Sequence, residues 1–518
     1  MSDHEEIHIE SSLPKVWEQE ETFNDVLYDW MGRAPWLAIS LGLHFVAYFI
    51  LLAIPWHLFD KEEEIVMETS IEQPPPPEEE EPEEPEEEVE EEQEVEPQIQ
   101  DMEVSDHNET ESQEDFEEAL GDPDQEANSP FDNDNFNNVI GSGGGAGGKF
   151  GGRMGGRKNL SARGGRPVAE AIQAGLEWLK KHQSEDGYWD VDEFFTNNVS
   201  GGTGCTEGAG IASQDVGITG LALLAFLGDG SSTRQGEYRD VVKRGIKWLG
   251  DQQDEDTGLI GEQIGHSFVY DHAISSLAMA ENFYDSKNPF QKKQTQLAMN
   301  FISRARAPYG GWRYEVPSDG DTDTSITGWM IFALKAGDDA HLKVDKEGYL
   351  NALEWIESVT DPATGRIGYI GPERGGRSSR TEANSDYPAD LTEAMTGVGL
   401  LTRVFLGQTP DKNPIMTKHG DLLLRTLPEW DEKGHKVDMY YWYYGTYAMY
   451  QLGGEHWKKW KAAMEKAIIP HQRQDGDYKG SWDPVGPWGY QGGRVYSTAA
   501  MVLTLEVFYR YSGLLGAR

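Results

Sequence analysis

The chain has 518 residues, of which 37% are hydrophobic, and a formal net charge of −47. This length suffices for one large or two medium domains. More than half of the negative charge falls in residues 61–120, which hold 28 Asp and Glu against one Lys, a net of −27. The single cysteine, Cys205, excludes an intrachain disulfide framework and a multi-cysteine zinc site.

The first long apolar run is "WLAISLGLHFVAYFILLAIPW", which extends from Trp36 to Trp56 without an Asp, Glu, Lys or Arg. Its 21 residues are long enough to cross a hydrocarbon core of roughly 30 Å, with a Trp at each edge as an interfacial anchor. We therefore predict a cytoplasmic segment at 1–33 and a single transmembrane helix at 34–59. Arg33 precedes the span, whereas Lys61 is followed by an acidic run, so the positive-inside rule favours N-in. The large C-terminal domain is then expected outside the cytoplasm, on the cytoplasmic (inner) membrane.

Ser40 and His44 lie one helical turn apart within this span. An ionisable residue at membrane depth is costly and by default suggests a function. The Ser-x3-His pair, with the later "EQPPPPEEEEPEEPEEEVEEE", resembles the anchor and spacer of TonB over about residues 36–100, although the family's second Ser falls at Pro55. The resemblance implies that Ser40 and His44 contact an ExbB/ExbD-type proton motor. The alternative is a plain anchor with an interfacial His.

Two segments without helical or strand periodicity follow the span. Residues 60–140 are acidic and interrupted by Pro, so they cannot bury a core and are predicted to form a disordered, extended tether. Residues 141–165 are rich in Gly and Arg and are predicted to form a flexible linker. Gly/Arg tracts can bind nucleic acid, but the expected location outside the cytoplasm leads us to predict no nucleic-acid partner.

The last 350 residues contain two interleaved families of helices. "GLEWLKKHQSEDGYW" at Gly175 returns as "GIKWLGDQQDEDTGLI" at Gly245, and each copy predicts an amphipathic helix that ends in a turn. We expect such helices at about 167–183, 239–253, 292–306, 346–358, 414–427 and 456–471. Between them lie apolar helices that begin at Asp215, Asp271, Asp323 and Thr392, with two more at about 438–452 and 495–511. Six buried helices that alternate with six amphipathic ones predict an all-α fold, an α/α toroid over residues 166–518.

The turns of this repeat resemble a known family. Gln183-x-x-Asp186-Gly187-x-Trp189 is similar to the QW motif of the squalene cyclase and prenyltransferase repeat family, and Gln472-x-x-Asp475-Gly476 matches it in part. The resemblance implies a terpenoid cyclase-like toroid in which the Gln and Trp tie an outer helix to the next turn.

Asp321 and Asp323 occupy the turn "DTDT" before one apolar helix. Squalene–hopene cyclases carry an Asp-x-Asp-Asp turn whose central acid protonates an alkene, but Thr324 stands here where the last Asp belongs. Because Asp215 and Asp271 hold the same place in their own repeats, we expect Asp323 to cap its helix, an interaction worth about 1 kcal/mol. Catalysis by Asp323, with Asp321 beside it, is the alternative.

Other chemistries known in related toroids lack their residues. A prenyltransferase-type zinc site needs an Asp two residues before the cysteine, and this position is Thr203. A thioester needs a Gln that "CTEG" at Cys205 does not supply. The sequence therefore predicts neither a metal nor a cofactor.

A cluster of aromatic residues is the strongest indication of a ligand. We expect six of them to line the centre of the ring, namely Trp312, Trp329, Tyr440, Tyr443, Tyr447 and Tyr496. Such side chains can fill a core, line a groove for an isoprenoid, lipid or glycan, or stabilise carbocations. The leading hypothesis is a membrane-anchored binding or interaction protein coupled to a proton motor. The alternative is a cyclase-like enzyme that acts on isoprenoids, or a carbohydrate-active toroid.

Overall fold

The computed structural model describes His44, Arg153 and residues 155–197, 205–372, 376, 386–389, 392–431 and 435–510. All of them except His44 belong to the second of two units into which the chain divides, Gln113–Arg518. Within the described residues, no helix is both long enough and apolar enough to cross a membrane. The predicted segments at 1–33 and 60–140, and the predicted span at 34–59 apart from His44, lie outside the described residues. His44 itself is helical and exposed.

The regular secondary structure of the described part of the second unit is helical. Its only β-type pairings are two isolated bridges, Gln253–Ile260 and Thr360–Ile367, each within a turn that follows an outer helix. Short non-α turns lie at Ser161–Gly165, Phe194–Asn197, Ala212–Gln214, Ile469–His471 and Gly476–Tyr478. The predicted all-α class is therefore confirmed for these residues.

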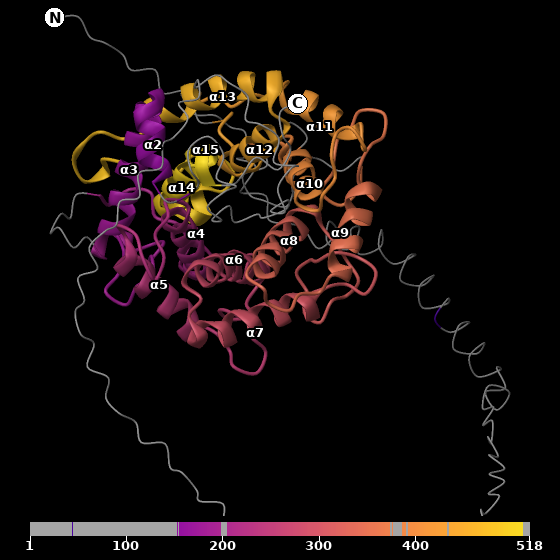
Figure 1. Ribbon diagram of the computed structural model, residues 1–518, viewed down its shortest axis with the longest axis horizontal. Coiled ribbons are helices and arrows are strands. Elements are labelled where there is room, and N and C mark those ends of the chain that lie inside the picture. Colours follow the sequence, from indigo (N-terminus) through magenta and orange to yellow (C-terminus); the bar gives the residue numbers. More distant parts are fainter. Residues whose placement is uncertain are drawn as a thin grey trace, which may run out of the picture. The chain divides into compact units, whose positions relative to one another are not determined.

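Six helices form a closed inner ring, which Figure 1 shows end on. They are α4 (Asp215–Gly228), α6 (Phe268–Ser286), α8 (Thr324–Asp339), α10 (Ala394–Phe405), α12 (Met439–Leu452) and α14 (Gly489–Leu505). Each contacts the next in chain order, and α14 contacts α4 to close the ring. These helices are apolar around most of their circumference because both faces are covered, so that Ala222 to Phe226 of α4 are wholly buried.

Six amphipathic helices form the outer ring. They are α3 (Arg166–Lys181), α5 (Arg239–Asp251), α7 (Pro289–Ala305), α9 (Glu347–Ser358), α11 (Ile415–Leu423) and α13 (Gly454–Ile468). Each packs on one inner helix or across two neighbouring ones. In α3, for example, Ile172, Leu176 and Leu179 are buried at helical spacing while Lys180 and Lys181 remain exposed. The predicted toroid of six inner and six outer helices is confirmed.

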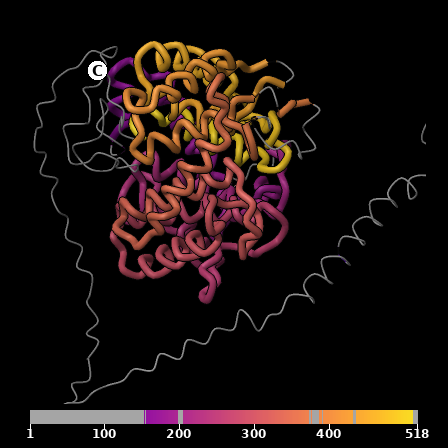
Figure 2. The backbone as a smooth tube through the Cα atoms, turned by 90° about the vertical axis from the view of Figure 1, so that its right-hand side faces the viewer, coloured from indigo at the N-terminus to yellow at the C-terminus, as the bar shows by residue number. Residues whose placement is uncertain are grey.

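Figure 2 shows the same unit after a quarter turn, and in Figure 1 the orange α11 and α13 lie across the ring from α5 and α7. The inner helices run parallel to one another. Pairs of contacts show this. A Cβ on Gly217 of α4 would meet Asp271 of α6, and one on Gly220 would meet Ser275. The contacts Thr392–Asp438 and Gly397–Gly445 relate α10 and α12 in the same sense. All six inner helices therefore begin at the same end of the ring.

The repeated turns hold the two rings together in the way that their resemblance to the QW motif implies. Three tryptophans each donate an indole N–H to a carbonyl in the last turn of the preceding outer helix: Trp189 to Leu179 (2.8 Å), Trp312 to Ile302 (2.7 Å) and Trp482 to Ile468 (2.9 Å). Three glutamines each bridge their own turn and the next outer helix: Gln183 to Gly187 and Val241, Gln253 to Gly258 and Gln294, and Gln472 to Gly480 and Ala171. Gln472 bonds to Ala171 in α3, the first outer helix. The ring is therefore closed by the same glutamine contact that joins its successive repeats.

The described part of the Gly/Arg-rich segment is folded against the toroid, which differs from the predicted linker at 141–165. Helix α2 (Gly156–Leu160) packs on the short α15 (Val507–Arg510), and Leu160 joins the core. Arg153 is 5% exposed and its Nη1 lies 2.6 Å from Oε2 of the buried Glu281. The glycines and arginines of this stretch serve close packing and buried ion pairs, so the ordered unit begins before the predicted boundary at 166.

Candidate functional site

A cavity of about 610 Å³ lies at the end of the ring where the inner helices begin. Its walls come from the first turns of α4, α6, α8 and α12, from a longer stretch of α14, and from the loops that precede α6, α8, α10 and α14. Nine of the lining side chains are aromatic: Tyr270, Tyr314, Trp329, Tyr369, Tyr440, Tyr443, Trp488, Tyr490 and Tyr496. Between them lie aliphatic side chains such as Ile218, Leu221 and Ile274. The cavity is within the size range of small-molecule sites.

Four of the six expected ligand-lining residues lie on this wall: Trp329, Tyr440, Tyr443 and Tyr496. The rings of Trp329 and Tyr443 are stacked, with their centroids 6.0 Å apart and a 14° angle between their planes. The hydroxyls of Tyr440 and Ser325 are hydrogen-bonded at 2.9 Å and join α12 to α8 across the ring.

The other two expected residues, Trp312 and Tyr447, do not line the cavity. Trp312 is wholly buried in the turn between α7 and α8, where its indole makes the repeated contact described above. Tyr447 lies one turn deeper on α12 than Tyr443, and its hydroxyl donates to the carbonyl of Leu503 at 2.6 Å. Both side chains hold helices together, so their expected role at the cavity wall needs correction.

Asp323 is the N-cap of α8, as predicted. Its carboxylate accepts the backbone N–H of Ile326 at 2.9 Å, and the Tyr369 hydroxyl donates to it at 3.0 Å. Burial raises the pKa of Asp323 to about 6, although the hydrogen bonds from Ile326 and Tyr369 oppose the rise. The side chain is wholly buried behind Tyr369 and is not part of the cavity wall. Tyr369, and not Asp323, therefore faces the cavity.

Asp321 lies on the surface. Its side chain is 62% exposed, and Oδ2 accepts a hydrogen bond from Nη1 of Arg313 at 2.5 Å. Arg313 does line the cavity, and its Nε is 3.9 Å from Oδ2 of Asp323. The two aspartates of the "DTDT" turn therefore meet at one arginine, which sequence analysis did not single out because it lies in an aperiodic loop.

Asp215 and Asp271 do not cap their helices, in contrast to the prediction. Asp215 accepts the backbone N–H of Val191 at 2.9 Å, and the cap position of α4 belongs to Gln214. Helix α6 begins three residues before Asp271, at Phe268, so Asp271 lies inside its first turn. Asp215, Asp271 and Asp323 thus align in the sequence repeat but occupy different positions relative to the first residue of their helices.

Asp271 is the only carboxyl side chain among the described residues of the cavity wall. It is 7% exposed and accepts a hydrogen bond from the backbone N–H of Gly217 in the neighbouring α4. Burial raises the pKa of Asp271 to about 8, against the opposing effect of that hydrogen bond. A Cβ at position 217 would lie 2.2 Å from Oδ1 of Asp271, so this approach requires glycine. At neutral pH the cavity therefore contains a protonated carboxyl group that can donate a hydrogen bond.

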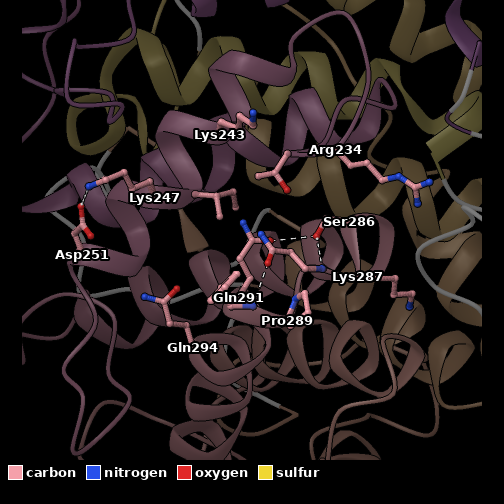
Figure 3. Close-up of a pocket in the computed structure, with 13 residues that line it drawn as sticks. Arg234, Lys243, Lys247, Asp251, Ser286, Lys287, Pro289, Gln291 and Gln294 are labelled. Carbon is pink, nitrogen blue, oxygen red and sulfur yellow. Dashed lines mark hydrogen bonds and ion pairs between the residues drawn. The ribbon is translucent and has the colours of Figure 1, made fainter. Parts of the chain in front are cut away.

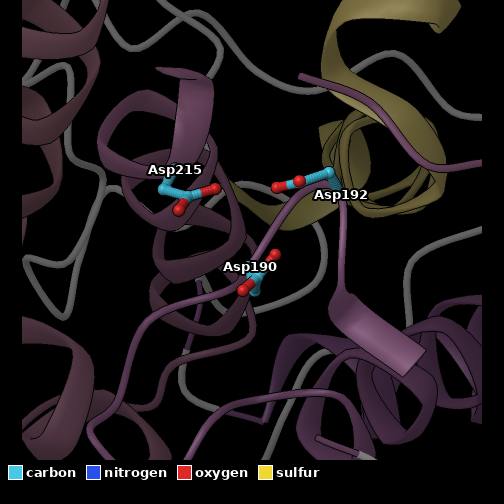
Figure 4. A group of neighbouring side chains, drawn as sticks. All are labelled: Asp190, Asp192 and Asp215. Carbon is cyan, nitrogen blue, oxygen red and sulfur yellow. The ribbon is translucent and has the colours of Figure 1, made fainter. Parts of the chain in front are cut away.

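Three carboxylates gather beside the start of α4, as Figure 4 shows: Asp190, Asp192 and Asp215. Their closest oxygens lie within 4.8 Å of one another, and all three side chains are half-buried. Oxygen ligands suit hard cations, but the N-terminal end of a helix carries a partial positive charge that opposes a cation. Burial raises the pKa of Asp215 to about 7, which further weakens it as a metal ligand. We assign no metal to this group.

A second hollow of about 570 Å³ lies on the outer surface, between α5 and the turn from α6 to α7. Four of its lining residues are basic: Arg234, Lys243, Lys247 and Lys287. Lys247 is paired with Asp251, and Figure 3 shows the side chains of Arg234 and Lys287 extending away from the hollow. Basic groups that point outward do not form a binding site, so the central cavity is the better candidate.

No family model matches the chain, and no curated protein matches it at a significant level. Among solved structures, it is similar to an inactive variant of the alpha-1,6-mannanase of Salegentibacter sp. HEL1_6 in complex with alpha-1,6-mannotriose, at 10% identity over 66% of this chain and 99% of that chain, with a TM-score of 0.46. It is also similar to the type II terpene cyclase MstE from Scytonema, at 13% identity over 66% and 98% of the two chains, with a TM-score of 0.42. A novel alpha-amylase from Clostridium perfringens gives 10% identity over 66% and 98%, with a TM-score of 0.44. Similarities of this size carry no inference about activity.

Proposed function

We propose that the toroid binds an apolar ligand of the isoprenoid class in its central cavity. The proposal is supported chiefly by the nine aromatic side chains around a cavity of about 610 Å³. A glycan would require polar partners along its whole length, because every buried hydroxyl needs one. The aliphatic side chains between the aromatics, among them Leu221, Ile274 and Leu503, offer none. The walls therefore suit a hydrocarbon body better than a sugar chain.

An unpaired hydroxyl at the cavity wall gives the proposed ligand one further property. The hydroxyl of Tyr496 is buried and has no hydrogen-bond partner among the residues that the structure describes, although Tyr496 lines the cavity. A buried polar group without a partner typically costs about 1–3 kcal/mol. A ligand that carries an oxygen at this point would remove that cost. We thus expect the apolar ligand to carry at least one polar atom.

Catalysis is the second candidate function, and Asp271 is the observation that favours it. A protonated carboxyl that faces an aromatic-lined cavity is placed to transfer a proton to a bound ligand, and aromatic faces stabilise a cation that forms there. However, each unit by which burial raises the pKa weakens the acid by about 1.4 kcal/mol. Protonation of a carbon–carbon double bond needs a strong acid, so we place binding ahead of cyclisation.

One experiment separates the two functions. The full-length chain, purified in detergent, is incubated with squalene and with farnesol, and bound ligand and products are analysed by mass spectrometry. We expect either probe to be recovered unchanged from the wild type and to be lost from a Trp329→Ala/Tyr443→Ala double variant. A cyclised product that disappears in Asp271→Asn would instead establish catalysis. Failure of both probes to bind would contradict the proposed function.

The position of the toroid in the cell is a separate proposal that rests on the sequence. The apolar span at 34–59 would anchor the chain in the cytoplasmic membrane with the toroid outside the cytoplasm. Ser40 and His44 would contact an ExbB/ExbD-type motor, and the acidic segment that follows would carry its motion to the toroid. Support comes from the Ser-x3-His spacing and the Pro/Glu-rich composition.

A further inference from the structure

Arg313 is the only Arg or Lys among the described residues of the central cavity wall. It lies in the loop between α7 and α8, and its side chain is 14% exposed. Of its five N–H donors, the structure pairs one, on Nη1, with Asp321. Its Nε is buried and has no hydrogen-bond partner within the described part of the chain, because the Asp323 oxygen is 3.9 Å away. Arg313 therefore has unused donors at the cavity wall.

Helix dipoles favour a negative charge at this end of the cavity. Tyr314, Tyr369 and His266 lie on the same part of the wall, and the His266 ring stacks on Tyr314 with centroids 4.7 Å apart. The Tyr369 hydroxyl donates to Asp323, so the Tyr314 hydroxyl donates to Tyr369, and both protons are already used. The inner helices also begin here, so the positive ends of several helix dipoles are directed toward the cavity mouth. The lining residues from α4 and α14 include the apolar Ile218, Leu221 and Leu503.

The present partner of Arg313 is weakly held. Asp321 is 62% exposed, and its loop contains Gly320 with a φ of 94°. An ion pair with a solvated carboxylate typically contributes only about 0.2–1 kcal/mol. An arginine that binds an enclosed phosphate or carboxylate gains charge-assisted and commonly bidentate hydrogen bonds, which are roughly twice as strong as neutral ones. An anionic ligand would therefore displace Asp321 at little cost.

We propose that Arg313 binds the anionic head group of the apolar ligand, a phosphate or a carboxylate, and that Asp321 occupies this arginine until the ligand displaces it. The inference rests on the proposed function, because it concerns the same cavity. It defines the ligand further as an amphiphile, with its hydrocarbon part between α4, α6 and α14 and its charged end at the loop before α8. Asp323, behind Tyr369, stays in place as the cap of α8 and keeps a negative charge near the arginine.

The test measures dissociation constants of the full-length chain for three probes: farnesol, farnesyl phosphate and oleate. We expect both anionic probes to bind at least tenfold more tightly than farnesol. If only farnesyl phosphate bound more tightly than farnesol, the head group would be a phosphate. If only oleate did, it would be a carboxylate. Equal binding of all three would overturn the inference but leave the proposed function intact. Failure of all three to bind would overturn both.

Variants then assign the preference to Arg313. Arg313→Gln should abolish the preference for anionic probes, so that all three probes bind about equally, with circular dichroism as the check on folding. Asp321→Asn should strengthen binding of the anionic probes by up to about fivefold, because it frees the arginine. Glu315→Gln is the matched control: Glu315 is exposed on the same loop, so its variant removes one negative charge without touching Arg313. If Glu315→Gln raised the affinity for the anionic probes as much as Asp321→Asn, the cause would be the change in net charge. That result would contradict the displacement of Asp321 by the ligand.

Discussion

Arg510 and Glu281 form a fully buried ion pair, with Nη2 of the arginine 3.0 Å from Oε2 of the glutamate and neither side chain exposed. The pair joins α15, at the end of the described chain, to α6 in the inner ring. Arg153 binds the same glutamate from the N-terminal side. One carboxylate thus connects the two ends of the toroid, at the opposite end of the ring from the cavity.

Replacement of Glu281 by Gln should destabilise the toroid strongly. Arg153 and Arg510 would lose the carboxylate that they share, although Glu506 stays 3.2 Å from Nη1 of Arg510, and removing one partner of a buried ion pair typically costs about 3–5 kcal/mol. Urea unfolding followed by circular dichroism measures the change. Glu185→Gln, on an exposed turn, is the control and should change the free energy of unfolding by less than about 0.5 kcal/mol. A loss below 1 kcal/mol in Glu281→Gln would show that the cluster does not close the ring.

The same glutamate predicts a loss of stability in acid. Burial alone would raise its pKa, but Arg153 and Arg510 outweigh burial and hold the pKa of Glu281 below its usual range. A depressed pKa in the folded state adds stability that is complete above the unfolded-state pKa and is lost as the pH falls through the folded-state pKa. The wild type should therefore lose stability below about pH 4.5, whereas Glu281→Gln should lose less over the same range.

Asp271 predicts a pH dependence of the opposite sign. Its pKa is raised to about 8 in the folded protein from a usual value near 4. Between these values the folded state binds the proton and the unfolded state does not, so this carboxyl lowers stability as the pH rises, by up to about 1.4 kcal/mol per unit. Asp271→Asn retains the oxygen that accepts from Gly217 and cannot ionise. Its stability relative to the wild type should therefore grow between pH 5 and pH 8, and a difference that does not vary with pH would contradict the assignment.

The repeat pattern alone was sufficient to predict the ring, because helix spacing and buried faces depend on short-range periodicity. It predicted the helices, while the structural role of Gln183 and Trp189 was implied by the resemblance to the QW motif. It failed where contacts are long-range: Arg153 meets Arg510 across a separation of 357 residues, and no local pattern indicates that approach. The same limit applies to Arg313, whose place on the cavity wall follows from how its loop folds over the ring.

Helix phase explains the errors at the candidate site. Tyr443 and Tyr447 are four residues apart and share a face of α12, so sequence alone does not separate the one at the cavity wall from the one a turn deeper. Asp271 was expected to cap its helix because its motif aligns with that of Asp323. Three additional residues at the start of α6 place it inside the helix and toward the cavity instead.

Asp323 provides a test of the capping role. Asn also caps helices well, so Asp323→Asn should change stability by less than about 0.5 kcal/mol, apart from the lost attraction to Arg313. Asp323→Ala should cost about 2 kcal/mol, at the upper end of the capping range, because the hydroxyl of Tyr369 also loses its acceptor. Thermal unfolding of the two variants decides this point. Equal losses in both would mean that charge, rather than capping, is what Asp323 contributes.

The predicted membrane anchor is tested by the polar pair of residues in the span. His44→Ala should leave membrane insertion unchanged, because the span stays apolar, and abolish co-purification with ExbB/ExbD-type subunits. Ser40→Ala should weaken that co-purification. Leu43→Ala is the matched control within the same span and should change neither property. Retention of the subunits by His44→Ala would leave the span as a plain anchor.

The proposals for the toroid all require that a ligand binds in the central cavity. Native mass spectrometry of the full-length chain, released from detergent after incubation with farnesyl phosphate, measures this binding. Ala500 lines the cavity, so Ala500→Phe fills part of the space without removing a polar group. We expect one ligand per chain in the wild type and a loss of at least tenfold in occupancy in Ala500→Phe, with folding preserved. Equal occupancy in both proteins would place the ligand elsewhere and contradict the account.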